Sequence, residues 1–94
     1  MYVTRRYRMW GRVQGVGFRA FVWREARVLE VDGWVRNRRD GSVEALVQAG
    51  HEGHSRLLSA LEQGPRLARV DRVEATDEDR DRGISTGFEI RDDA

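Results

Sequence analysis

The sequence contains no cysteine, and this absence excludes a disulfide framework, a thiolate nucleophile and a thiolate metal site. No apolar run approaches the roughly 20 residues that a membrane-spanning helix needs. The first ten residues, MYVTRRYRMW, lack the apolar stretch of a secretory signal. A chain of 94 residues has enough surface to bury for one hydrophobic core. We therefore expect a single domain over residues 1–94, located in the cytoplasm.

Lysine is also absent, so all 17 basic residues are arginine, and they are unevenly distributed. Residues 1–39 carry ten arginines and three acids, and ten less three leaves a net charge of +7. Residues 40–94 carry seven arginines and thirteen acids, and seven less thirteen leaves −6. A concentration of positive charge in one half of the chain favours an anionic ligand there.

The basic half contains a glycine-rich segment, Gly11–Arg19, with the sequence GRVQGVGFR. Glycine permits positive φ and a close approach of the backbone to a ligand. Successive N–H groups beside a helix N-terminus bind anions, and Arg19 would add a planar cation that matches phosphate oxygens. The segment predicts a small oxyanion or phosphate site. Glycines alone are equally compatible with a tight turn that has only a structural role.

Two other glycine-loop motifs fit less well. Residues 15–20 match the dinucleotide pattern G-x-G-x-x-A. The chain is too short for a doubly wound nucleotide domain, however, and the strands that follow are predicted to form a hairpin. The nucleoside-triphosphate loop is excluded because no lysine follows the glycines.

Apolar residues that alternate predict strands, and apolar residues with a helical period predict helices. From these patterns we expect strands over Thr4–Val13, Gly33–Arg39, Ser42–Ala49 and Leu67–Ala75, a short last strand at Phe88 and Ile90, and helices over Phe18–Val31 and Glu52–Gln63. The charged residues 76–86 predict a loop.

Local signals add detail to this order. Asp40-Gly41 predicts a hairpin with a type I′ turn, in which both residues have positive φ. Val70 and Val73 are three residues apart within a predicted strand, which suggests a β-bulge. The order β-α-β-β-α-β, with one short extra strand, predicts a ferredoxin-like α+β sandwich: an antiparallel sheet with two helices on one face.

The segment Gly33–Glu44, GWVRNRRDGSVE, follows the glycine-rich segment and the helix FRAFVWREA. Taken together, these segments resemble the acylphosphatase family, and a later Gly64-Pro65-x-x-Ala68-x-Val70 pattern extends the resemblance over most of the chain. The resemblance implies a ferredoxin-like fold and an enzyme that hydrolyses the carboxyl–phosphate bond of small acyl phosphates to a carboxylate and inorganic phosphate. We expect the enzyme to be a monomer.

The resemblance also implies two catalytic residues. Arg19 would hold the substrate phosphate together with loop amides, and Asn37 would orient the attacking water. From spacing alone Asn37 would be interpreted as an ordinary polar residue within a strand. The loop whose backbone amides we expect to bind phosphate comprises Gln14, Gly15, Val16, Gly17, Phe18 and Arg19.

An acyl phosphate leaves as a carboxylate, whose conjugate acid has a pKa of about 4, so the leaving group needs no general acid. We therefore expect no metal, no cofactor and no covalent intermediate. Phosphate or sulfate would also fit the site as anions. We expect no nucleic-acid partner and no membrane partner.

Two alternative functions remain. RNA-recognition domains share the order of elements, but the predicted strand Ser42–Ala49 has no stacking aromatic residues. A non-catalytic phosphate- or anion-binding regulatory domain could use the same fold, although the presence of both Arg19 and Asn37 argues against it. His51 and His54 have a spacing that could bind metal, but without a third ligand we expect them to be solvated or at the core edge. The sequence does not indicate whether the acidic end, Asp92-Asp93-Ala94, folds back toward Arg19.

Overall fold

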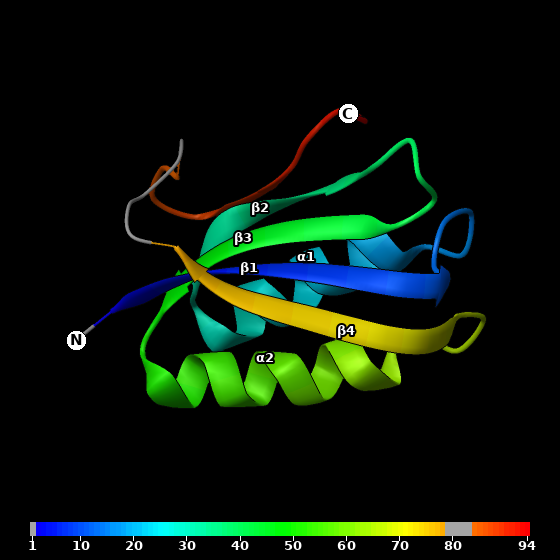
Figure 1. Ribbon diagram of the computed structural model, residues 1–94. Helices are drawn as coiled ribbons and strands as arrows, with labels where there is room; N and C mark the ends of the chain where they lie inside the picture. The colour runs from blue at the N-terminus through cyan, green and yellow to red at the C-terminus, as the bar shows by residue number, and fades with distance from the viewer. Residues whose placement is uncertain (1, 79–83) are drawn as a thin grey trace.

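The structure is a computed structural model that describes residues 2–78 and 84–94. Two helices pack against one face of a five-stranded sheet (Figure 1). In chain order the elements are β1 (Val3–Arg12), α1 (Phe18–Leu29), β2 (Asp32–Asn37), β3 (Val43–Ala49), α2 (His51–Gln63), β4 (Arg69–Glu78) and β5 (Phe88–Ile90). This arrangement confirms the ferredoxin-like α+β fold. No helix in the described ranges is long and apolar enough to cross a membrane.

The strand order across the sheet is β4-β1-β3-β2-β5. The first four of these strands pair antiparallel, as expected, but β5 pairs parallel to β2. The sheet is therefore mixed rather than wholly antiparallel. Register explains the difference: the last residue of β4 pairs near the start of β1, at the same end of the sheet where β2 begins. A strand that starts from that end beside β2 runs in the direction of β2.

The expected β-bulge lies in β4. The pairing of β1 with β4 shifts by one residue between Trp10 and Gly11, which leaves Asp71 as the extra residue. The extra residue explains why Val70 and Val73 are three positions apart yet both pack against the core. Irregular spacing was therefore a valid signal for this bulge.

Several element boundaries differ from expectation by one to three residues, and the ends of α1 and β4 are the most informative. Helix α1 ends at Leu29, two residues early, because Glu30 has φ 57° and ψ 44°. This left-handed conformation ends the helix, and it costs a non-glycine residue roughly 1–2 kcal/mol. Strand β4 continues to Glu78, so the first residues of the predicted charged loop 76–86 belong to a strand. Of the remaining loop, residues 79–83 lie outside the described residues.

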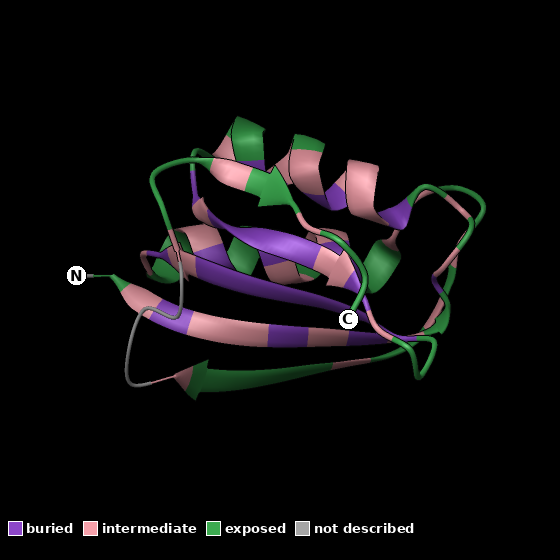
Figure 2. Cartoon of the chain, turned by 90° about the horizontal axis from the view of Figure 1, so that it is seen from above, coloured by how far each residue is buried: buried purple, intermediate pink, exposed green. Residues whose placement is uncertain are grey.

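The hydrophobic core lies between the helices and the sheet. Figure 2 shows that buried residues follow β3 closely, whereas β4 is mostly exposed. The fully buried larger apolar side chains of this core are Tyr7, Met9, Val13, Phe18, Val22, Val35, Val43, Val47, Leu57 and Leu61. Both ends of the glycine-rich loop are anchored in this core, through Val13 before it and Phe18 after it.

The face of the sheet away from the helices is covered by arginines. The Glu44 side chain is 1% exposed there and accepts hydrogen bonds from Arg36 Nε at 2.8 Å and Arg38 Nη1 at 3.2 Å. Burial alone would raise the pKa of Glu44, but Arg36 and Arg38 outweigh that effect and hold the pKa below its ordinary value. On the same face the Trp34 ring lies 4.7 Å from the Arg36 guanidinium and 5.0 Å from that of Arg91. Its contacts are therefore with the protein's own cations, unlike the bare rings on which RNA-recognition domains stack bases.

His54 on α2 is a core residue, and its ring is hydrogen-bonded on both sides. It is 1% exposed, with Nε2 2.7 Å from the Val3 carbonyl oxygen and Nδ1 2.8 Å from the Tyr7 hydroxyl. A carbonyl oxygen only accepts, so Nε2 carries the proton and Nδ1 accepts from the tyrosine. His51 is exposed. The described ranges contain no group of three or more His, Cys, Asp or Glu side chains that could hold a metal.

Burial gives His54 a predictable effect on stability, because it lowers the pKa of the ring below its ordinary value of 6.5. The unfolded chain therefore binds a proton first as the pH falls. We expect the free energy of unfolding to be highest above pH 6.5 and to decline as the pH falls toward the folded-state pKa. Denaturant unfolding between pH 7.5 and 5.0 measures this slope.

Two matched variants test whether the titration of the His54 ring causes this pH dependence. His54→Gln offers a donor to Val3 and an acceptor to Tyr7 without titrating, so its unfolding free energy should vary less over the same range. His51→Gln changes an exposed ring and should retain the wild-type slope. An unaltered slope in His54→Gln would contradict this assignment.

Candidate active site

The loop between β1 and α1 depends on glycines for its conformation. Gly15 has φ 75° and Gly17 has φ 78°, and a Cβ atom at either would meet nothing within 4 Å. The requirement is therefore for a left-handed backbone and not for space. Gly17 is the N-cap of α1, no side chain caps the helix, and no acid lies in its first turn. The positive end of the helix is left available to a ligand.

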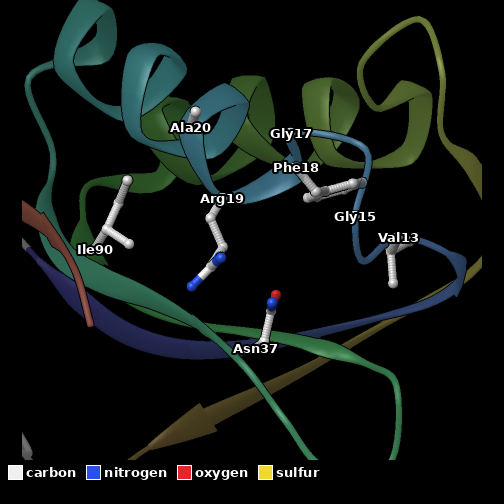
Figure 3. A pocket seen from close by; sticks show the side chains of 8 residues that line it. All are labelled: Val13, Gly15, Gly17, Phe18, Arg19, Ala20, Asn37 and Ile90. Atoms are coloured by element: carbon white, nitrogen blue, oxygen red, sulfur yellow. The ribbon is translucent and has the colours of Figure 1, made fainter. Parts of the chain in front are cut away.

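A pocket of about 270 Å³ lies beside this loop (Figure 3). Its lining residues are Val13, Gly15, Gly17, Phe18, Arg19, Ala20, Asn37 and Ile90. Arg19 enters from the first turn of α1, and Asn37 enters from the last residue of β2. Figure 3 shows the two side chains extending into the same space from opposite walls. The structure therefore brings together Arg19 and Asn37, the two residues whose catalytic roles the family resemblance implies.

Asn37 is placed by the hairpin that follows it. The expected type I′ turn is wrong: of the hairpin residues only Gly41 has positive φ, at 91°. The Gly41 N–H donates to the Arg38 carbonyl at 3.2 Å, and the Arg38 N–H donates to the Ser42 carbonyl at 2.9 Å. The loop therefore has three residues and ends in a left-handed glycine, another common hairpin form. Hydrogen bonds from the Ser42 hydroxyl and N–H to Asp40 lower the pKa of that carboxyl.

The Gln14 side chain joins the glycine loop to this hairpin. Its Nε2 donates to the Arg38 carbonyl at 2.7 Å and to the Ser42 carbonyl at 2.8 Å. These contacts fix the loop relative to the strand end that carries Asn37. The sequence pattern predicts a role only for the backbone of Gln14, and no local signal indicates this side-chain contact across 24 residues. Neither Gln14 nor Val16 lines the pocket, and phosphate binding by the loop amides from Gln14 to Arg19 stays a prediction.

The C-terminal residues do fold back toward Arg19. After β5 the chain continues along β2: the Arg91 N–H donates to the Val35 carbonyl at 2.9 Å, and the Ala94 N–H donates to the Asn37 carbonyl at 3.0 Å. This path brings Asp93 Oδ1 to 3.2 Å from Arg19 Nη1. Both side chains are substantially exposed, at 66% and 39%, so the ion pair contributes little to stability. Its importance lies in its position beside the pocket.

The chemistry of the pocket follows from these groups. A permanent cation, an uncapped helix N-terminus and a left-handed glycine loop converge on one small volume, which suits a tetrahedral oxyanion. A neutral carboxamide faces the cation and can hold a water molecule near that anion. The fold and the pocket together define a small α+β domain with a binding site suited to a tetrahedral oxyanion.

Comparison with known proteins specifies the family. Residues 5–90 match the family model of the acylphosphatases. The chain is 52% identical to an acylphosphatase from Thiobacillus denitrificans over 83 residues, which are 88% of this chain and 90% of that protein. It is 57% identical to an acylphosphatase from Thermococcus kodakarensis over 67 residues, 71% of this chain and 74% of that protein.

Solved structures indicate the same family. The crystal structure of acylphosphatase from Bacillus subtilis is similar with a TM-score of 0.88 and 35% sequence identity, covering 95% of this chain and 98% of that one. The chain belongs to the acylphosphatase family, and it is an enzyme that hydrolyses acyl phosphates.

Proposed function

We propose that this chain hydrolyses small acyl phosphates by in-line attack of water on phosphorus, with Arg19 binding the phosphoryl group and Asn37 orienting the water. The main support is the convergence of these two side chains on one pocket beside the uncapped N-terminus of α1. The amides of the loop from Gln14 to Arg19 would share the phosphoryl oxygens with the guanidinium.

The reaction needs few groups. The water oxygen forms a bond to phosphorus while the bond from phosphorus to the acyl oxygen breaks, and the products are a carboxylate and inorganic phosphate. Negative charge on the equatorial oxygens is stabilised by Arg19 and the loop amides. The Asn37 carboxamide aligns the water opposite the leaving carboxylate. A phosphoryl oxygen of the substrate takes the proton from the water, so the proposal requires no metal or cofactor.

Hydrolysis of acetyl phosphate in ¹⁸O-labelled water tests this route. Attack on phosphorus places the label in inorganic phosphate, whereas attack on the carbonyl carbon places it in acetate. We expect the label in phosphate after the uncatalysed reaction has been subtracted, and an unchanged rate in excess chelator. Label in acetate would overturn attack on phosphorus, and loss of activity with chelator would overturn metal independence.

We propose further that residues 1–94 act as a single monomeric domain in the cytoplasm and that inorganic phosphate or sulfate competes for the same pocket. Sedimentation at micromolar concentration tests the monomer. Competitive inhibition by phosphate that weakens when Arg19 is replaced would support the shared site.

A further inference from the structure

The pocket has two different sides. Figure 3 shows Gly15 and Gly17 of the loop on one side of Arg19, and Ile90 of β5 on the other. The loop side offers the groups that suit a phosphoryl group. The opposite side offers an aliphatic side chain, because Ile90 lines the pocket while remaining 46% exposed. Ala20, one residue along α1 from Arg19, also lines the pocket.

An exposed isoleucine at the rim of a polar pocket has a definite consequence for a ligand. With the phosphoryl group between the loop and Arg19, the part of the pocket left for the acyl group would be the side toward β5 that Ile90 lines. Apolar groups of the substrate would then cover Ile90, and the surfaces of both would be removed from water. Each fully buried methylene would strengthen binding by a factor of about four.

The C-terminal residues add charge beside the pocket. They follow β5 directly, and the Asp93 carboxylate contacts the Arg19 guanidinium 3.2 Å away. A second anionic group on the acyl chain would approach Asp93 as a like charge. The repulsion between two unit charges about 4 Å apart in water would weaken binding by a factor of about five. Salt would reduce this repulsion.

We propose that this side of the pocket selects acyl phosphates whose acyl group is apolar and uncharged. Ile90 contacts the acyl group, and Asp93 opposes substrates that carry a second negative charge. The inference rests on the proposed function, because it assumes that the phosphoryl group binds between the loop and Arg19. It assigns a substrate class to a pocket in which the sequence alone reveals no acyl-binding residue.

Three substrates separate these effects: acetyl phosphate, benzoyl phosphate and 4-carboxybenzoyl phosphate. The two aromatic compounds differ by one carboxylate, and each rate is corrected for uncatalysed hydrolysis. For the wild type we expect kcat/KM to be about fivefold higher for benzoyl than for 4-carboxybenzoyl phosphate at low salt, with the difference shrinking at high salt.

Two variants test the residues. Ile90→Thr keeps a β-branched side chain in the strand, and it should reduce the ratio of kcat/KM for benzoyl to acetyl phosphate about fivefold. Asp93→Asn should raise kcat/KM for 4-carboxybenzoyl relative to benzoyl phosphate about fivefold. Any general effect of freeing Arg19 cancels in that ratio.

Leu67→Thr and Glu62→Gln alter an exposed apolar residue and an exposed acid that do not line the pocket. Both should leave every ratio unchanged. Ratios in Ile90→Thr and Asp93→Asn equal to those of the wild type, with acetyl phosphate still hydrolysed, would overturn the proposed selectivity alone. Absence of acetyl phosphate hydrolysis by the folded wild type would overturn the proposed function, and the selectivity with it.

Discussion

Replacing Arg19 with glutamine is expected to lower kcat/KM for acetyl phosphate by about 10³-fold, with kcat reduced and KM raised together. A single arginine on a transferring phosphoryl group contributes on the order of 10³–10⁵ in rate in comparable enzymes. The KM should rise because the guanidinium contacts the phosphoryl oxygens of the bound substrate, and kcat should fall because those contacts strengthen as charge develops. Steady-state phosphate release measures both constants.

The structure supplies controls for this variant. Arg19→Lys keeps the charge but loses the planar pair of donors, so it should fall between the wild type and Arg19→Gln. Arg24→Gln removes an exposed arginine of the same helix that does not line the pocket, and it should behave as the wild type. The unfolding midpoint of Arg19→Gln should change little, because the ion pair with Asp93 is exposed. Activity within tenfold of the wild type would contradict the assigned role.

Asn37→Ala is expected to lower kcat by about 10²-fold with little change in KM. The side chain is 8% exposed and lines the pocket opposite Arg19. Its removal leaves the phosphate contacts of Arg19 and the loop in place but releases the water, and loss of alignment costs on the order of 10² in rate. The backbone contacts of residue 37 with Val43 and Ala94 do not involve the side chain and should persist.

Gln48→Ala is a suitable comparison, because Gln48 is a polar strand residue that pairs with Asp32 at the opposite end of β2. It should retain wild-type kinetics. Retained kcat with a large increase in KM for Asn37→Ala would make Asn37 a phosphate-binding residue. Unchanged values of both constants would remove it from the mechanism.

The order of elements could be predicted because each long element carries its own periodic pattern. The misplaced details depend on contacts that a local pattern does not record. Glu30 ends α1 in a left-handed conformation that its side chain does not favour. The direction of β5 follows from the end of the sheet at which β4 finishes. The turn after Asn37 takes its form from hydrogen bonds between Arg38 and Gly41 and between Arg38 and Ser42.

In the candidate site, too, some residues could be predicted from a local pattern and others could not. Arg19 was recognisable from the residues alone, because it follows glycines at a predicted helix start. Asn37 was not, and only the family resemblance distinguished it from other polar strand residues. The side-chain contacts of Gln14 and Asp93 join segments 24 or more residues apart through loops and an edge strand. Sequence periodicity contains no information about such contacts.

The bulge in β4 has a consequence for how the molecule behaves among its own copies. Edge strands are the natural templates for aggregation, since their free backbone groups can pair with another chain. One edge of this sheet is β4, which is interrupted by the bulge at Asp71 and carries charged side chains along most of its length. The other edge is β5, which has only three residues. Both edges thus discourage the intermolecular strand pairing that seeds fibrils.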